Sequence, residues 1–144
     1  MKREIKFRVW DKAKYRMLGV DQLAFGPNGE LVSIYSDGPD FSNDSDALMG
    51  EKPDLNEAVL MEYTGLHDKN GREIYEGDII VTHPKSKYEA PESGVVQYGG
   101  SRPMFGYKTE DGEEYDIWSS NAYRTYEVIG NIFENPEMLE ADHE

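Results

Sequence analysis

The stretch from Met61 to Val81 constrains the fold of this chain more than any other segment. It begins with alternating apolar and polar residues, and Asn70-Gly71 then supplies the dipeptide that most readily forms a type I′ hairpin turn. After the turn, Ile79-Ile80-Val81 is an unbroken β-branched run, typical of a strand buried on both faces. The segment therefore predicts a hairpin that leads into the first strand of a small barrel.

Alternation and turn signals predict two more hairpins before this stretch. Residues 4–10 alternate, with Lys6 and Arg8 on the face opposite the apolar side chains, and residues 15–20 are expected to return as a second strand. Asn28-Gly29 lies between two apolar runs and predicts the next hairpin.

The remainder of the chain is predicted to be short strands with little helix. Strands are expected at 94–98, 104–108, 115–118 and 126–132, and the proline-containing segment 82–93 is expected to be a surface excursion. Short helical turns are predicted at 54–59, with Asp54 as cap, and after Pro136, with Asn135 as cap.

These patterns predict a mainly β protein, with α+β as the open alternative. We expect N-terminal antiparallel β-hairpins at 1–36, which form a possible oligomerisation arm, and an acidic linker at 37–57. A small SH3-like β-barrel is predicted at 58–139, followed by a disordered tail at 140–144. The barrel topology is inferred from strand spacing.

Charge is distributed unevenly along the 144 residues. The chain carries a net charge of −14, yet residues 1–16 have a balance of +5 and the other residues a balance of −19. An acidic body repels nucleic acid phosphates at long range, so the basic segment is expected to complement acidic surface of its own chain or of another copy. With no cysteine, the chain has no disulfide, thiolate metal site or cysteine nucleophile. The lack of a long apolar run or a signal peptide predicts a cytoplasmic protein without membrane contact.

Three blocks of sequence resemble a known family. Residues 4–11, EIKFRVWD, residues 61–79, MEYTGLHDKNGREIYEGDI, and residues 127–137, EVIGNIFENPE, are similar to the signature blocks of YopX-like phage and prophage proteins. The blocks occur in the family's order, and segments 36–57 and 82–93 are where the chain differs. The resemblance implies a β-rich, homo-oligomeric protein of phage or prophage origin, and it implies no enzymatic activity.

The polar motifs favour structural roles over catalytic ones. Asp68-Lys69-Asn70-Gly71 resembles the start of a calcium loop, but Arg72 and Glu73 stand where that loop needs an oxygen ligand and glycine. Asp78, next to Gly77, is expected to accept hydrogen bonds from local backbone amides. We therefore predict no catalytic, metal-binding or cofactor-binding residues and no cofactor.

Two sets of apolar residues are candidates for contacts with partners. The first is predicted to form an oligomer interface with a second copy and consists of Ile5, Phe7, Val9 and Trp10. The second is predicted to bind a partner, although packing in the core is the simpler expectation, and consists of Tyr98, Phe105, Tyr107, Tyr115 and Trp118.

The sequence favours a non-enzymatic accessory protein that self-associates and binds an unidentified host or phage protein. One alternative is a nucleic-acid-associated module, in which the basic segment contacts phosphates and aromatic rings stack on bases. Another is a DNA-mimicking regulatory protein whose acidic surface occupies the cationic site of a host protein. A hydrolase that uses Glu76 and Asp78 is the enzyme hypothesis, and no base or nucleophile can be assigned to it.

Overall fold

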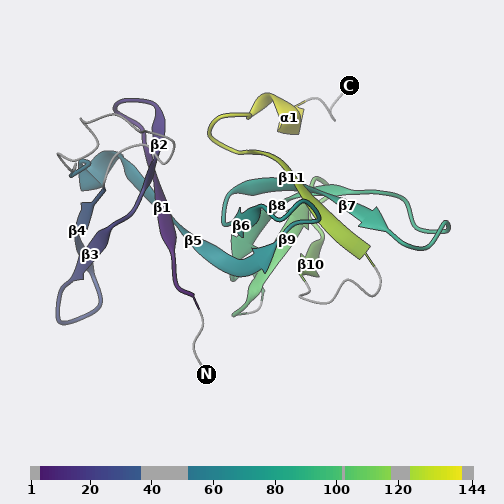
Figure 1. Cartoon of the computed structure of the whole chain (residues 1–144), viewed down its shortest axis with the longest axis horizontal. Helices are drawn as coiled ribbons and strands as arrows, with labels where there is room; N and C mark the ends of the chain where they lie inside the picture. The colour runs from purple at the N-terminus through teal and green to yellow at the C-terminus, as the bar shows by residue number, and fades with distance from the viewer. Residues whose placement is uncertain (1–3, 37–51, 102, 118–123, 141–144) are drawn as a thin grey trace. The chain divides into compact units, whose positions relative to one another are not determined.

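The computed structural model describes residues 4–36, 52–101, 103–117 and 124–140, and Figure 1 shows their arrangement as short strands with one turn of α-helix at the end. The mainly β fold is confirmed. The chain divides into two compact units, an N-terminal unit of residues 4–62 and a C-terminal unit that begins at Tyr63. This division lies inside a strand, β5 (Ala58–His67), whereas the sequence analysis placed the start of the second domain at residue 58.

The N-terminal unit is built around β1 (Phe7–Asp11), which lies between β2 (Arg16–Gly19) and the first half of β5. Both pairings are antiparallel, and Val9 lies opposite Leu18 on one side and Leu60 on the other. Both edges of β1 are paired, and its residues from Arg8 to Asp11 are buried, with Arg8 only 9% exposed. The alternation that puts Lys6 and Arg8 opposite the apolar side chains therefore does not mark a solvent-exposed face at Arg8.

A second hairpin completes the N-terminal unit. It pairs β3 (Gln22–Phe25) with β4 (Leu31–Tyr35), as the Asn28-Gly29 signal predicts, and Gly29 has the positive φ of 85° that such a turn requires. The core of the unit consists of Val9, Leu18 and Ile34, with partly buried aliphatic side chains packed around them. Most of these side chains come from strands, which alternation correctly assigned.

The predicted helix at 54–59 is shorter than expected. A 3₁₀ turn, η2 (Leu55–Glu57), is capped by Asp54, whose carboxylate accepts a hydrogen bond from the Asn56 N–H at 2.9 Å. Ala58 then has extended backbone angles and begins β5. The cap is confirmed, and the helix ends early because β5 pairs with β1 from Ala58 onward.

The central hairpin of the sequence is present, with a different turn from the one predicted. The second half of β5 pairs with β6 (Glu73–Tyr75), and Gly71 has a φ of 86°. Asn70 does not have the positive φ that a type I′ turn needs at both central residues. The Asp68 carboxylate organises the loop instead, because it accepts hydrogen bonds from the N–H groups of Asn70 and Arg72, each at 2.9 Å.

The C-terminal unit contains a five-stranded antiparallel sheet in the order β10-β9-β8-β7-β11. Its strands are β7 (Asp78–Pro84), β8 (Ser93–Tyr98), β9 (Phe105–Thr109), β10 (Glu114–Asp116) and β11 (Arg124–Asn131). Ile79 and Ile80 are both buried, so the β-branched run does lie in a strand covered on both faces. The strand number equals that of the predicted SH3-like barrel, and closure into a barrel stays a prediction.

Two details of this unit differ from expectation. β7 continues to Pro84, so the surface excursion begins after residue 84 and not at 82. The predicted terminal helix is a single turn, α1 (Glu137–Glu140), after Pro136. Asn135 precedes it, but the Asn135 side chain accepts a hydrogen bond from the Asn131 N–H at 3.2 Å and so serves the preceding turn.

Candidate functional site

Histidine and acidic side chains are the residues of this chain that could hold a metal ion. Among these residues, no three His, Asp or Glu side chains gather closely enough to hold a metal ion. His67 lies 3.3 Å from the hydroxyl of Tyr63, and His83 lies 2.8 Å from a carboxylate oxygen of Glu127. His143, the third histidine of the sequence, lies outside the described residues.

Asp68 shows how a motif that resembles a calcium loop is used here. Besides its two bonds within the turn, its second oxygen accepts a hydrogen bond at 2.9 Å from the buried N–H of Val128 in β11. Burial acts to raise the pKa of Asp68, but the three backbone hydrogen bonds outweigh it and hold the pKa below its ordinary value. The carboxylate therefore joins the β5–β6 loop to β11, and its acceptor positions are directed at the chain's own backbone.

Asp78 is equally unsuited to chemistry on a substrate. It is completely buried, and its carboxylate accepts a hydrogen bond of 2.7 Å from the N–H of Tyr75. This is the local backbone role expected from the sequence. A hydrolase that used Glu76 and Asp78 would need a carboxylate that substrate can reach, and Asp78 offers none.

The predicted partner-binding aromatics lie on one face of the sheet as two cross-strand pairs. Tyr98 faces Phe105 with ring centroids 5.0 Å apart, and Tyr107 stacks on Tyr115 at 5.3 Å. Tyr98 is 53% exposed and Tyr115 36%, whereas Phe105 is half-buried. The fifth residue of this set, Trp118, lies outside the described residues.

Tyr107 is a core residue. It is 1% exposed, packs with Tyr126, and accepts a hydrogen bond of 3.0 Å from the Arg124 guanidinium. Burial raises the pKa of Tyr107 to about 12. Tyr107 is therefore unavailable for surface contact. Alternation could not reveal this, because it predicts which face of the sheet a side chain lies on and not whether that part of the face is covered.

The predicted oligomer-interface residues range from exposed to fully buried. Ile5 is 60% exposed and Phe7 is half-buried. Val9 is fully buried in the core of its own unit, and Trp10 is 3% exposed, with its ring at 4.8 Å from that of Tyr15. Only the beginning of this segment presents apolar surface to solvent.

Sequence reasoning missed the apolar surface of the β3–β4 hairpin. Phe25 is 58% exposed, Val32 52% and Tyr35 42%. Val32 is the residue skipped where the pairing register shifts, so it does not follow the simple alternation of its strand. The local sequence predicts the hairpin correctly but carries no signal for this irregularity.

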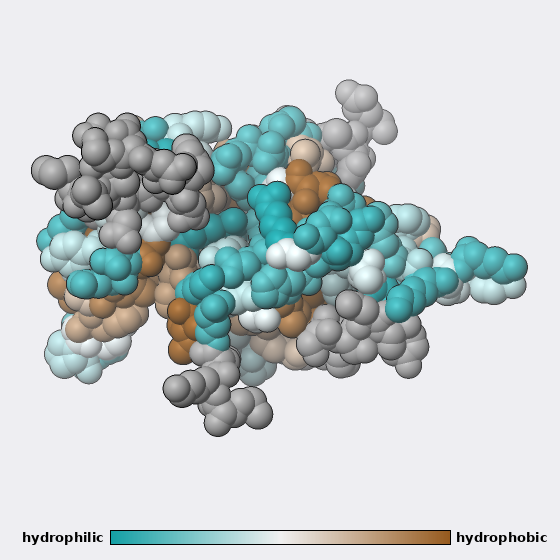
Figure 2. Space-filling view, in the orientation of Figure 1, coloured by the Kyte–Doolittle hydropathy of each residue, from teal (hydrophilic) through white to brown (hydrophobic). Residues whose placement is uncertain are grey.

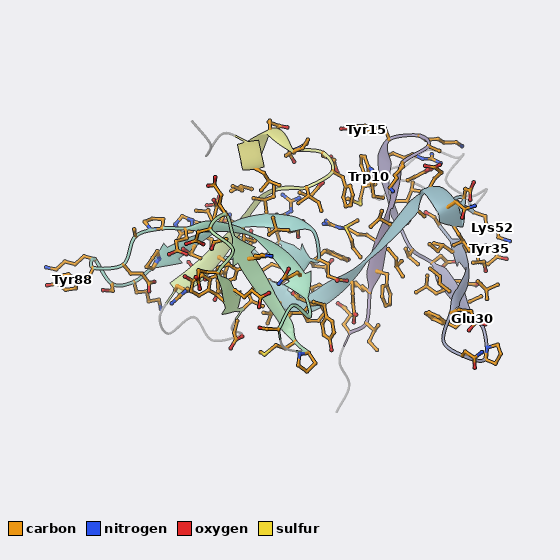
Figure 3. The ribbon with its side chains drawn as sticks, turned by 180° about the vertical axis from the view of Figure 1, so that it is seen from behind. Trp10, Tyr15, Glu30, Tyr35, Lys52 and Tyr88 are labelled. Carbon is orange, nitrogen blue, oxygen red and sulfur yellow. The ribbon has the colours of Figure 1, made fainter. Side chains whose placement is uncertain are left out.

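Two turns end in an exposed tyrosine. The turn between β1 and β2 places Tyr15 at φ 52°, and the arm of residues 85–92 between β7 and β8 carries Tyr88. Figure 3 shows Tyr88 at the tip of this arm, pointing away from the sheet, and Tyr15 next to Trp10. Neither tip was selected from the sequence.

A shallow groove crosses the other face of the five-stranded sheet. It is lined by Ser93, Val95, Gln97, Lys108, Glu110 and Leu139. Lys108 and Glu110 are exposed, and their charges have opposite sign. No set of polar groups converges on one point within the groove, so its geometry does not indicate a ligand of particular chemistry.

Comparison with known proteins identifies relatives that share almost the whole chain. A family model described as "YopX protein" matches residues 6–140. The structure of protein EF1440 from Enterococcus faecalis is similar with 30% sequence identity and a TM-score of 0.62, and the match covers 96% of this chain and 99% of that one. Protein yopX from Bacillus subtilis is 22% identical with a TM-score of 0.63, over 93% of this chain and 95% of that one.

No curated protein sequence matches the chain. Among the described residues, no helix has the length and apolar character needed to cross a membrane. The comparisons therefore provide family and fold, and the structural neighbours do not assign an activity.

Proposed function

This chain belongs to the YopX protein family, and from that premise we propose that it is a non-enzymatic accessory protein of phage or prophage origin that self-associates and acts by binding another macromolecule. The polar residues that resemble catalytic or metal motifs, Asp68 and Asp78, are engaged by the chain's own backbone. We therefore propose that the protein acts through contacts made by its exposed surface.

The observation that carries the proposal is the apolar surface of the N-terminal unit. This unit has a closed core, yet Ile5, Phe25 and Val32 each leave more than half of the side chain in water. Removing apolar surface from water stabilises an assembly by roughly 25 cal/mol per Å². A second copy that covered these side chains would gain this free energy without any change to the core.

Charge favours a second copy as the occupant. The first sixteen residues have a balance of +5 and the remainder −19, so the basic segment of one copy matches the acidic surface of another. In this proposal the contact involves Ile5 and Phe7 together with the exposed Phe25 and Val32. Val9 and Trp10 support it from behind, because they fix β1 within its own unit.

Light scattering coupled to size-exclusion chromatography tests the proposal on the full chain. We expect an oligomer at micromolar concentration, and we expect Ile5→Asp combined with Phe25→Asp to shift the mass to that of the monomer. Both substituted side chains are exposed in the chain, so the fold should survive. Deleting β1 would be a poor test, since β1 is the central strand of its sheet.

Tyr98→Asp is the matched control. Tyr98 is similarly exposed but lies in the C-terminal unit, so this variant should keep the oligomer intact. A wild-type chain that elutes with the mass of a monomer at micromolar concentration would contradict self-association. Loss of the oligomer in Tyr98→Asp with no loss in the double variant would move the interface to the other unit.

A further inference from the structure

Aromatic and apolar side chains reach water at one end of the five-stranded sheet. Tyr98 pairs with Phe105 across two strands, with ring centroids 5.0 Å apart. Tyr115 stacks on the buried Tyr107 at 5.3 Å. Tyr98 is 53% exposed, Met104 38% and Tyr115 36%. All of these residues belong to the C-terminal unit, so the surface is complete within one unit.

A small hollow lies at this end of the sheet. Met104, Phe105 and Tyr115 line it together with the acidic residues Glu114 and Asp116. Its volume is about 20 Å³, which is room for about one group the size of a water molecule. The ammonium group of lysine is a compact charge of this size, whereas the guanidinium of arginine is planar and larger. The hollow therefore suits an ammonium group between apolar and acidic walls.

Glu114 is held at the hollow by hydrogen bonds from its own chain. Its Oε2 atom accepts from the Ser101 hydroxyl at 2.6 Å and from the Ser101 N–H at 3.2 Å, and its Oε1 atom accepts from the Gln97 amide at 3.3 Å. The bonds from Ser101 contribute most to holding the pKa of Glu114 below its ordinary value, so the side chain carries its charge at neutral pH. Because each carboxylate oxygen accepts about two hydrogen bonds, Oε1 can accept one more from a cation.

Negative charge also surrounds the ring of Tyr115. The charge of Glu92 contributes most to raising the pKa of the Tyr115 hydroxyl, and burial, Asp111 and Glu113 raise it further. Arg124 acts in the opposite direction but does not reverse the shift. Glu92 is the last residue of the arm between β7 and β8, which Figure 2 shows as a hydrophilic projection. The exposed edge of the ring therefore lies among carboxylates from two different segments.

The β9–β10 hairpin as a whole is acidic. Residues 105–116 contain one lysine and five acidic residues, which is a balance of −4. Such a surface repels the phosphates of nucleic acid and attracts cations. A lysine side chain matches both of its properties, because the ammonium group interacts with carboxylates and with aromatic faces while the methylene stem packs on apolar surface.

We propose that this end of the sheet binds an extended, lysine-bearing segment of a partner protein. The ammonium group of one lysine occupies the hollow beside Glu114 and Asp116, and neighbouring residues of the segment lie against the rings of Tyr98 and Tyr115. A small free amine would fill the hollow but leave these rings in water, so a peptide gains more from the surface. The inference rests on the proposed function and specifies the chemistry of the macromolecule that is bound.

Fluorescence anisotropy with the full chain and labelled octalysine tests the inference. We expect octalysine to bind at low salt and to bind more weakly as salt rises, because salt screens the exposed charges. Tyr115→Ala should lower the affinity about fivefold, the loss expected from one cation–π contact at an exposed site. Tyr115→Phe keeps the ring and should retain the affinity. Tyr98→Ala gives an independent variant, because Tyr98 is more exposed than Tyr115 and its removal should disturb the fold less.

A second pair of substitutions tests the hollow. Glu114→Gln with Asp116→Asn removes two charges and should lower the affinity for octalysine about fivefold. The loss for octaarginine should be smaller, because a guanidinium group is too large for the hollow. The matched control, Asp21→Asn with Glu137→Gln, removes the same charge from exposed positions elsewhere and should leave the affinity unchanged. Urea midpoints of all variants check that the fold is intact.

The inference is overturned by a flat titration with octalysine at low salt, by an unchanged affinity in both tyrosine-to-alanine variants, by an equal loss in the control, or by equal losses for the two peptides. Light scattering on the same samples separates it from the proposed function. An oligomer that does not bind octalysine removes this inference and leaves self-association standing. If Glu114→Gln with Asp116→Asn dissolves the oligomer, a second copy occupies this surface, which also overturns the inference.

Discussion

The two units differ in how far along the chain their buried carboxylates reach, although both are built from antiparallel strands. The core of the N-terminal unit is aliphatic, with Val9, Leu18 and Ile34 at its centre. Both units also bury a carboxylate that accepts a backbone hydrogen bond, but Asp11 binds an N–H only two residues later, whereas Asp68 of the C-terminal unit also binds an N–H of β11 sixty positions later. Nonpolar contacts tolerate substitution of similar volume, whereas a buried carboxylate demands its partners at fixed positions.

Several buried polar residues of the C-terminal unit fall within the blocks of sequence that resemble the family. Asp68 and Asp78 fall in the central block of similarity, and Asn131 falls in the last one. The Asn131 carbonyl oxygen of the side chain accepts hydrogen bonds from Phe133 and Glu134, which forms the turn after β11. In this chain, these polar residues hold loops in place. The central block, which is the longest of the three, therefore contains residues with a structural role.

The largest expected effect comes from a cavity in either core. Leu18→Ala and Ile80→Ala each remove a fully buried aliphatic side chain and should lower the free energy of unfolding by about 3 kcal/mol. In a Trp118→Phe background, Trp10 is the remaining tryptophan and reports on the N-terminal unit. We expect Leu18→Ala to shift the urea transition seen by Trp10 fluorescence and Ile80→Ala to leave it in place.

Equal shifts of the Trp10 transition by both variants would show that the units unfold as one. Circular dichroism at the same urea concentrations is the control, since it follows strands in both units. If the two units unfold separately, the circular dichroism of the Ile80→Ala variant should show two transitions. The Trp10 fluorescence should then change only in the transition of the N-terminal unit.

A smaller loss is expected at Asp68. Asp68→Asn keeps the size of the side chain but replaces one acceptor oxygen with an NH₂ group, which cannot accept the hydrogen bonds that this oxygen receives from backbone N–H groups. We expect a loss of about 2 kcal/mol in the C-terminal unit, measured by urea denaturation.

Asp111→Asn is the matched control, because Asp111 also lies in a hairpin turn beside a glycine and accepts a hydrogen bond from the Glu113 N–H at 3.3 Å. Asp111 is exposed, so water replaces what the substitution removes. A smaller shift than that of Asp68→Asn is expected. Equal shifts would show that the bond from Val128 to Asp68 contributes little.

The contribution of Asp68 should also depend on pH. Its pKa is lowered in the folded chain, so its stabilisation is complete above the unfolded pKa of about 4 and is lost as pH falls through the folded value. The difference in stability between wild type and Asp68→Asn should therefore be constant near neutral pH and shrink below about pH 4. Urea midpoints from pH 7 to pH 2.5 measure it, and an unchanged difference at the acid end would contradict the prediction.

The sequence predicted the structural features that depend on residues close together in the chain. Turn signals located the hairpins at Asn28-Gly29 and Asn70-Gly71, and the run at Ile79 identified a strand buried on both faces. The sequence did not predict features that depend on contacts between segments far apart in the chain. The bond from Val128 to Asp68 joins residues sixty positions apart, and Arg8 of β1 lies opposite Met61 of β5 in the sheet.

The candidate surfaces show the same limit. Tyr98 and Tyr107 lie on one sheet face, but the alternation of aromatic residues could not tell the buried middle of that face from its exposed end.

The smallest expected effect is on the surface pair between β7 and β11. His83 lies 2.8 Å from a carboxylate oxygen of Glu127, and Lys69 lies 4.0 Å from the same oxygen. All three side chains are about one-third exposed or more, so water screens them and Lys69 stays in place when His83 is removed. His83→Gln should therefore cost about 0.5 kcal/mol or less in the C-terminal unit, and a double-mutant cycle with Glu127→Gln should give a coupling of similar size. A loss close to that of Asp68→Asn would mean that this unit depends on its surface charges as much as on its buried carboxylates.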